Sequence, residues 1–213
     1  MPDLEIIGIP QSNYVWTCRI VCAEKGAPYK LIPAAPHSPE VNAVHPFGKI
    51  PVMRHSDVTL YESRAICAYV DRVFDGPPLV PAMPHLAAQV EQWISVINTQ
   101  IDPLLVRQYL LGYFFPGTPD GKPDRTRIDA ALPQMEKHFA MLDRGVGKTG
   151  FLVASAFSIA DATLVPILYY LTKAPESKAM MDNARNLNAY LKKMMERKSV
   201  AETTPPPPPE RHN

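Results

Sequence analysis

A proline-rich segment divides this chain into two stretches with different sequence patterns. Residues 75–84 read D-G-P-P-L-V-P-A-M-P, and their four prolines cannot donate to a sheet ladder or continue a helix. Short apolar runs alternate with helical patterns before this segment, whereas only helical periodicity follows it. The sequence therefore predicts an α/β first part joined by a linker to an all-helical second part.

The changes in composition also place the domain boundaries. We expect an α/β domain over residues 1–75, a linker over residues 76–84 and a helical domain over residues 85–200. Residues 201–213 contain five consecutive prolines, which bury little apolar surface and have no backbone donors. We expect this tail to be disordered or a polyproline II stub.

Apolar periodicity predicts the elements inside each domain. The predicted strands are residues 4–9, 29–32, 52–55 and 58–61, and the predicted helices of the first domain are residues 15–25 and the run after Ser63. The helical domain has patterns over residues 85–115, with Pro103 as a kink, and over 124–144, 159–171 and 186–197. In S-I-A-D, Ser158 is predicted to be an N-cap, with Asp161 reaching back to its N–H.

Composition argues against several classes of protein. The net charge is +1 and no long basic run appears, so a nucleic-acid partner is disfavoured. The three cysteines have no metal-ligand spacing and are expected to be buried thiols. No apolar run approaches the ~20 residues of a membrane span, and the N-terminus lacks the positive segment of a signal peptide. We therefore expect a cytoplasmic protein without a metal or a membrane contact.

Four motifs give the chain a family resemblance. They are S-N-Y-V-W-T-C-R (residues 12–19), H-P-F-G-K-I-P-V (45–52), L-Y-E-S-R-A-I (60–66) and F-S-I-A-D-A (157–162). Their order and spacing resemble a serine-type cytosolic glutathione transferase of the phi or zeta kind, over nearly the whole chain. The resemblance implies a thioredoxin-like N-terminal domain, an all-α C-terminal domain, and glutathione as a co-substrate.

The resemblance also implies how glutathione is held. A proline at the place of Pro51 is cis, and the backbone of Ile50 then bonds the cysteinyl part of glutathione as an added strand would. Glu62 is expected to hold the γ-glutamyl ammonium. Ser63, at the start of a helix, is expected to hold the γ-glutamyl carboxylate. Alternatively, Pro51 only shapes a turn and Ser63 is a plain N-cap.

The glycyl carboxylate of glutathione needs a positive or donating group. By resemblance, His37 and Lys49 stand where phi-class relatives keep such groups. Two prolines beside His37 leave its local backbone hard to place from the sequence. A lone surface histidine without a function is the alternative for His37.

Glutathione chemistry requires a thiolate, and the free thiol has a pKa of roughly 8.5 to 9. Ser12 lies between the first strand and the first helix, where its hydroxyl can donate to the sulfur and the helix N-terminus favours negative charge. It also takes the place of the first cysteine in glutaredoxin-like C-P-Y-C, which argues against disulfide exchange. Tyr14 and Thr17 are competing donors, and a mere capping role for Ser12 is the remaining alternative.

We expect the enzyme to add the glutathione thiolate to apolar electrophiles. Zeta-class isomerases of maleylacetoacetate carry S-S-C-x-W-R-V-R, which Ser12, Trp16 and Arg19 match but Tyr14 and Thr17 do not. That isomerase is the first alternative, and a non-catalytic glutathione-fold binding protein is the second.

The electrophile site is expected to be apolar and aromatic. Tyr14, Tyr109, Tyr113 and Phe114 are its candidate residues, although aromatics at helical spacing also suit a core. By resemblance the protein is expected to be a homodimer, with the Trp93 face of the long helix as a candidate contact.

Overall fold

The computed structural model describes residues 3–206, which form two compact units. The first unit comprises residues 3–79 and 196–206, and the second comprises residues 80–195. The change of unit after Leu79 falls within the segment that the sequence analysis treats as a linker. Residues 196–200, however, belong to the first unit rather than to the helical domain in which the sequence placed them.

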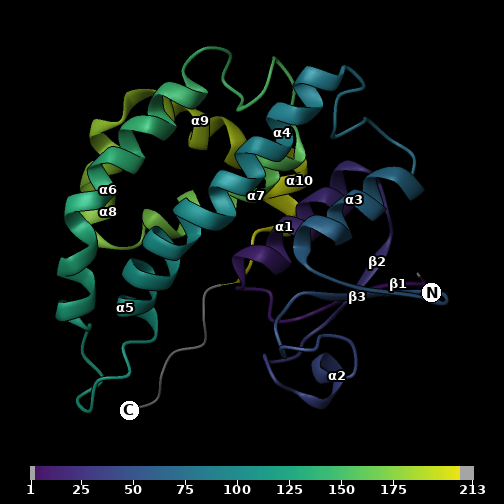
Figure 1. The fold of residues 1–213 in the computed structure, drawn as a ribbon, viewed down its shortest axis with the longest axis horizontal. Helices are drawn as coiled ribbons and strands as arrows, with labels where there is room; N and C mark the ends of the chain where they lie inside the picture. The colour runs from purple at the N-terminus through teal and green to yellow at the C-terminus, as the bar shows by residue number, and fades with distance from the viewer. Residues whose placement is uncertain (1–2, 207–213) are drawn as a thin grey trace. The chain divides into compact units, whose positions relative to one another are not determined.

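The first unit contains a four-stranded mixed sheet (Figure 1). Its strands are β1 (Leu4–Ile7), β2 (Tyr29–Ile32), β3 (Val52–His55) and β4 (Val58–Tyr61), in the order β2-β1-β3-β4. The pair β1–β2 is parallel, and both other pairs are antiparallel. The parallel pair needs a crossover, which helix α1 (Asn13–Glu24) supplies. This is the predicted thioredoxin-like topology.

Helices α1 and α3 (Ser63–Val73) pack against each other, and their apolar sides are buried. The three cysteines lie in this region as buried free thiols, as predicted, with 3.9 Å between the sulfurs of Cys18 and Cys67. Burial raises the pKa of the Cys18 and Cys22 thiols, so both stay protonated and unreactive at neutral pH. A short helix, α2 (Pro39–Asn42), lies between β2 and β3, where no helix or strand is predicted from the sequence.

Residues 196–206 belong to the first unit, and they run along α1. We call residues 196–206 the C-terminal arm, and it contains helix α10 (Lys198–Thr203), which packs on α1. The Trp16 indole N–H donates to Thr203 Oγ1 at 3.0 Å, and Arg197 Nη2 donates to Glu24 Oε2 at 2.7 Å. At the other end of α1, Gln11 Nε2 donates to the carbonyl of Pro206 at 3.3 Å.

The arm corrects the predicted tail. Residues 201–203 are helical, and Thr203 is buried against Trp16, although the sequence analysis assigned them to a disordered stretch. The tryptophan partner is far away in the sequence, so local composition does not reveal it. Residues 207–213, which hold most of the proline run, lie outside the described residues.

The second unit is helical throughout its secondary structure. Its elements are α4 (Pro84–Val96), the π-helical segment η1 (Ile97–Leu110), α5 (Leu111–Phe114), α6 (Arg125–Val146), α7 (Ile159–Leu171), α8 (Pro175–Asn183) and α9 (Arg185–Met195). Helix α7 is apolar along most of its length and contacts α4, η1, α8 and α9, so it forms the core of this unit. No helix of residues 3–206 is long and apolar enough to cross a membrane.

Two local predictions in this unit have different outcomes. The predicted kink at Pro103 stays a prediction, and the structure places this proline inside the wider turns of η1. Proline has no N–H to donate, and a widened helical register is one way to accommodate its ring. The capping prediction for α7 is confirmed, because Asp161 Oδ2 accepts from the Ser158 N–H at 2.9 Å and from its hydroxyl at 2.8 Å.

Candidate active site

Ser12 is the N-cap of α1. Its Oγ accepts a long hydrogen bond of 3.4 Å from the Val15 N–H, and its carbonyl accepts from Trp16 N at 2.9 Å. The side chain is half-buried. A serine hydroxyl has one hydrogen and two acceptor positions, so capping leaves its hydrogen able to donate to a ligand. The capping role and the role of thiol donor are therefore compatible.

The competing donors differ in their surroundings. Thr17 is buried, and its hydroxyl donates to the carbonyl of Asn13 at 3.0 Å, inside its own helix. That geometry makes Thr17 a poor donor to a ligand. Tyr14 is half-buried and stays a candidate beside Ser12.

The Ile50–Pro51 peptide bond is cis, as the resemblance implies. Pro51 is buried directly before β3, and Ile50 is half-buried. A Cβ at Gly8 would lie 2.6 Å from Val15 Cγ2 and 3.1 Å from Ile50 Cβ. Gly8, in the loop that leads from β1 to Ser12, therefore packs closely against Ile50. The structure thus brings Ser12 and Ile50, two predicted site residues, into one region.

Helix α3 begins at Ser63, and Glu62 is its N-cap residue. The sequence prediction that Ser63 is the N-cap is therefore wrong by one position. Glu62 has a φ of 68°, a conformation that sequence patterns associate with glycine or asparagine rather than glutamate. The Ser63 carbonyl accepts a weak bond from Cys18 Sγ at 3.8 Å, which ties the start of α3 to α1.

His37 is held in a left-handed conformation next to Lys49. Its φ is 64°, its N–H donates to the Gly48 carbonyl at 2.8 Å, and its carbonyl accepts from Asn42 Nδ2 at 2.8 Å. A Cβ at Gly48 would lie 2.2 Å from His37 Nδ1. The structure thus places His37 and the residue before Lys49 in direct contact. Asn42 and Gly48 are supporting residues that the sequence analysis missed.

Two of the aromatic candidates of the second unit, Tyr109 and Tyr113, bond the carboxylate of Glu176. Tyr109 is 0% exposed, and its hydroxyl donates to Glu176 Oε2 at 2.9 Å while accepting from Ser177 N at 3.0 Å. Tyr113 donates to the same Oε2 at 2.5 Å, and Arg125 Nη1 donates to Oε1 at 2.8 Å. Tyr109 is therefore a core residue, the alternative that its helical spacing left open.

Phe114 and Trp93 also pack within the second unit. The Phe114 ring meets Tyr170 edge-on, with 6.2 Å between the ring centroids. A Cβ at Gly145 of α6 would lie 2.6 Å from Trp93 Cη2, so the Trp93 ring lies closely on α6. The tryptophan that was expected to face a second subunit thus makes contacts inside its own chain.

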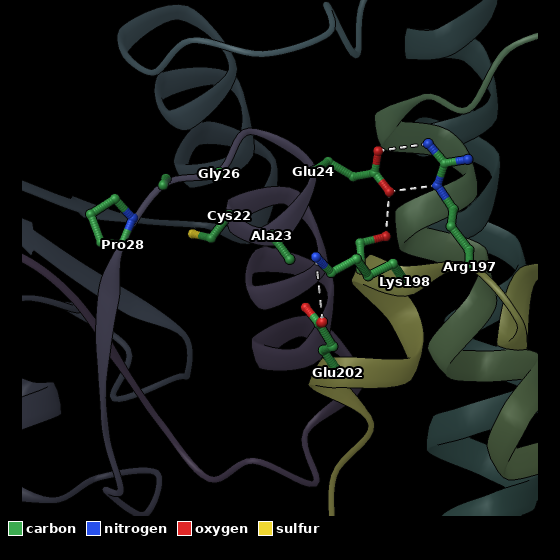
Figure 2. Close-up of a pocket in the computed structure, with 10 residues that line it drawn as sticks. Cys22, Ala23, Glu24, Gly26, Pro28, Arg197, Lys198 and Glu202 are labelled. Atoms are coloured by element: carbon green, nitrogen blue, oxygen red, sulfur yellow. Dashed lines mark hydrogen bonds and ion pairs between the residues drawn. The ribbon is translucent and has the colours of Figure 1, made fainter.

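A pocket of about 580 Å³ opens between the C-terminal end of α1 and α10 (Figure 2). Figure 2 shows the Glu24 carboxylate facing Arg197, and the Lys198 ammonium facing Glu202. Ser12 stands at the opposite end of α1, which is ~18 Å long at 1.5 Å per residue. The pocket is therefore separate from the predicted glutathione residues. Among residues 3–206, no group of three or more His, Cys, Asp or Glu could hold a metal ion.

Comparisons with known proteins agree with this arrangement. The family description "Glutathione S-transferase, N-terminal domain" matches residues 6–78, and "Glutathione S-transferase, C-terminal domain" matches residues 125–193. Glutathione S-transferase 1 of Zea mays is 29% identical over 209 residues, covering 94% of this chain and 95% of its own. Glutathione S-transferase 3 of Zea mays is 31% identical over 185 residues, 79% of each chain. The structure of glutathione S-transferase I from maize, in complex with an atrazine glutathione conjugate, has a TM-score of 0.83 at 26% identity, covering 94% of this chain and 96% of its own. The chain belongs to the glutathione S-transferase family.

Proposed function

We propose that the protein transfers glutathione to small, mainly apolar electrophiles, with Ser12 as the donor to the thiol sulfur. The observation that carries this proposal is the position of Ser12 at the N-terminus of α1, in a unit that also contains the cis Ile50–Pro51 bond. The maize relative whose structure holds a glutathione conjugate supports the same class of reaction. Glutathione is then a co-substrate that leaves with each product.

The reaction depends on stabilising a thiolate. The hydroxyl of Ser12 donates to the sulfur, and the positive end of the α1 dipole lies behind it. Lowering the thiol pKa by about two units corresponds to ~2.7 kcal/mol of preferential binding of the anion. The bound thiol releases its proton to solvent, the thiolate sulfur attacks an electrophilic carbon, and the leaving group departs with the electron pair of its bond. No oxidant or reductant is needed.

We assign the contacts of the rest of glutathione by the backbone groups and charges that it presents. The backbone of Ile50 bonds the cysteinyl part, and Glu62 holds the γ-glutamyl ammonium. The Ser63 N–H, at the start of α3, bonds the γ-glutamyl carboxylate. His37 and Lys49 attract the glycyl carboxylate, supported by the contact between His37 and Gly48.

The proposed contacts of the electrophile are aromatic. Tyr14 is the candidate in the first unit, and Tyr113 and Phe114 are the candidates in the second. We leave out Tyr109, because its ring is fully buried and its hydroxyl is engaged by Glu176 and Ser177.

The isomerase alternative gains no support from the geometry. Trp16, which matches the zeta-class pattern, is fully buried and donates its indole N–H to Thr203 in the C-terminal arm. This bond gives Trp16 a structural role. We therefore keep conjugation as the proposed reaction.

We also propose that the protein is a cytoplasmic homodimer with a role in detoxification. The support is the family membership and the dimer implied by the sequence resemblance. Light scattering after gel filtration tests the assembly, and a mass equal to one chain would contradict it. The face of α4 that carries Trp93 stays the candidate contact; the Trp93 ring is half-buried and packs partly on α6.

Turnover of 1-chloro-2,4-dinitrobenzene with glutathione tests the reaction. We expect activity in the purified protein, and an ultraviolet difference absorbance from the thiolate of bound glutathione. Retention on a glutathione column without turnover of any electrophile would favour the binding-protein alternative. Absence of both retention and turnover would overturn the proposal.

A further inference from the structure

A buried histidine lies next to Glu62 and has no part in the function proposed so far. His45 opens the H-P-F-G-K-I-P-V motif, and its side chain is only 2% exposed. Its Nε2 lies 3.7 Å from Glu62 Oε1. Glu62 is the residue to which we assign the γ-glutamyl ammonium, so the environment of its carboxylate bears directly on glutathione recognition.

The hydrogen bond at Nδ1 of His45 determines which ring nitrogen carries the hydrogen of the neutral imidazole. Nδ1 of His45 accepts from the Phe47 N–H at 3.1 Å. A ring nitrogen that accepts carries no hydrogen, so the hydrogen of the neutral imidazole sits on Nε2. The ring nitrogen nearest the carboxylate of Glu62 therefore carries the hydrogen.

Packing prevents the ring from turning away. Its centroid lies 4.8 Å from that of Tyr61 and 6.1 Å from that of Phe47. The backbone is also held, because His45 N donates to the Val41 carbonyl at 2.8 Å and the His45 carbonyl accepts from Gly48 N at 3.0 Å. The His45 ring, and with it the Nε2–H, is thus held in place by its neighbours.

The Glu62 side chain, unlike that of His45, is exposed to solvent. It is 68% exposed, and as the N-cap residue of α3 it makes no side-chain capping bond. A glutamate with three rotatable bonds loses considerable rotamer freedom when it binds a ligand. A neighbouring donor that restricts the carboxylate beforehand reduces this cost.

We propose that His45 is a positioning residue for glutathione binding. Its Nε2–H attracts one oxygen of the Glu62 carboxylate, which leaves the other oxygen directed at the γ-glutamyl ammonium. The 3.7 Å separation is longer than a hydrogen bond, so a small rotation of the exposed Glu62 side chain is needed to form it. This inference rests on the role proposed for Glu62, and goes beyond it by naming the group that orients that side chain.

Two variants separate the two ring nitrogens of His45. In His45→Asn the amide oxygen can replace Nδ1 as the acceptor for Phe47, but the side chain is too short to reach Glu62. In His45→Gln the amide N–H can reach the place of Nε2, while the acceptor for Phe47 is lost. If His45 positions Glu62, Asn raises the KM for glutathione about tenfold with little change in kcat, and Gln stays near wild type. If His45 only supports the turn, Gln is the more damaging variant.

A double-mutant cycle with Glu62→Gln makes the test specific. The effect of His45→Asn on the glutathione KM should disappear in the Glu62→Gln background. It should also disappear with a glutathione analogue that lacks the γ-glutamyl amino group. Additive losses in the cycle, or an equal loss with the analogue, would overturn the positioning role.

The same data distinguish failure of the inference from failure of the proposed function. If Glu62→Gln binds glutathione as tightly as the wild type, the assignment of Glu62 is wrong, and the inference fails with it. If Glu62→Gln binds weakly while His45→Asn binds normally, only the inference about His45 is wrong. Thermal unfolding of each variant shows whether a change in KM accompanies loss of the fold.

Discussion

Tyr190 donates a hydrogen bond of 2.9 Å to Asp161 Oδ1, and both side chains are buried. The same carboxylate accepts from the backbone of Leu152 at 3.0 Å and from that of Ser158 at 2.9 Å. Asp161 therefore joins the start of α7 to α9 and to the preceding loop. Burial raises the pKa of Asp161 although these bonds oppose the rise. Burial likewise raises the pKa of Tyr190, and the Asp161 carboxylate adds to that rise.

Replacing Asp161 should destabilise the second unit strongly. Asp161→Ala leaves several buried donors unsatisfied, and we expect a loss of about 3 to 5 kcal/mol in the free energy of unfolding. Tyr190→Phe removes a single bond and should cost about 1 to 2 kcal/mol. Urea unfolding measures both values. A loss under about 1 kcal/mol for Asp161→Ala would contradict the structural role given to this carboxylate.

Ionisation of Glu176 should make the free energy of unfolding depend on pH in the acidic range. Partial burial favours its neutral form, but hydrogen bonds from Tyr113, Arg125 and Tyr109 dominate and lower its pKa to about 2. A lowered pKa means that the ionised group stabilises the fold above its unfolded pKa of ~4.3, and that this contribution is lost as the pH falls towards about 2.

The matched variant for this effect is Glu176→Gln. At pH ~6 we expect it to be less stable than the wild type by about 1 to 2 kcal/mol, a range that allows for partial solvent screening of the site. The gap should narrow as the pH falls below ~4. A gap that is constant across this pH range, measured by urea unfolding, would show that the charge of Glu176 contributes nothing.

Two glycines with the same positive φ allow the environment of His37 to be tested. Gly26 and Gly48 both have a φ of 61°, but a Cβ at Gly26 meets nothing within 4 Å, whereas at Gly48 it meets the His37 ring at 2.2 Å. Gly26→Ala should cost about 1 to 2 kcal/mol through backbone strain alone. Gly48→Ala should cost more and should also raise the KM for glutathione, because His37 is displaced. Equal effects of the two substitutions on stability and KM would argue against a role for His37.

Ser12→Ala should separate catalysis from capping. Loss of the hydroxyl donor is expected to lower kcat about 100-fold and to abolish the thiolate absorbance of bound glutathione. Loss of the N-cap should cost about 1 kcal/mol of stability. Ser12→Thr, which keeps the hydroxyl, should retain much of the kcat and much of the stability. Undiminished thiolate absorbance in Ser12→Ala would move the donor role to Tyr14.

The sequence predicts the sheet well because its strands have clear local boundaries. Predicted strands at residues 29–32, 52–55 and 58–61 agree with the structure, since prolines and the Ser56-Asp57 turn delimit them. Residues 198–203 carry no comparable signal, because their burial depends on Trp16, which is distant in the sequence. Helix α8 was also missed, although Pro175 and Glu176 are typical of a helix start.

The features of the candidate site that belong to the sequence motifs could be predicted. The cis Ile50–Pro51 bond and the N-cap position of Ser12 agree with the expectations from the sequence. The positive φ of Glu62 and the contact between His37 and Gly48 do not follow from residue types, because they arise from how loops fold back on each other. The orientation of His45 likewise depends on a backbone N–H that only the structure locates.

The C-terminal arm makes the first unit discontinuous along the chain, and this determines when that unit can be finished during translation. A ribosome synthesises β1 and α1 before the second unit, yet Trp16 and Glu24 can meet Thr203 and Arg197 only after all of the second unit has been added. The thioredoxin-like unit is thus begun before the helical unit and completed after it. Residues 1–79 expressed alone would keep the sheet sequence but lack the helix that covers this side of α1.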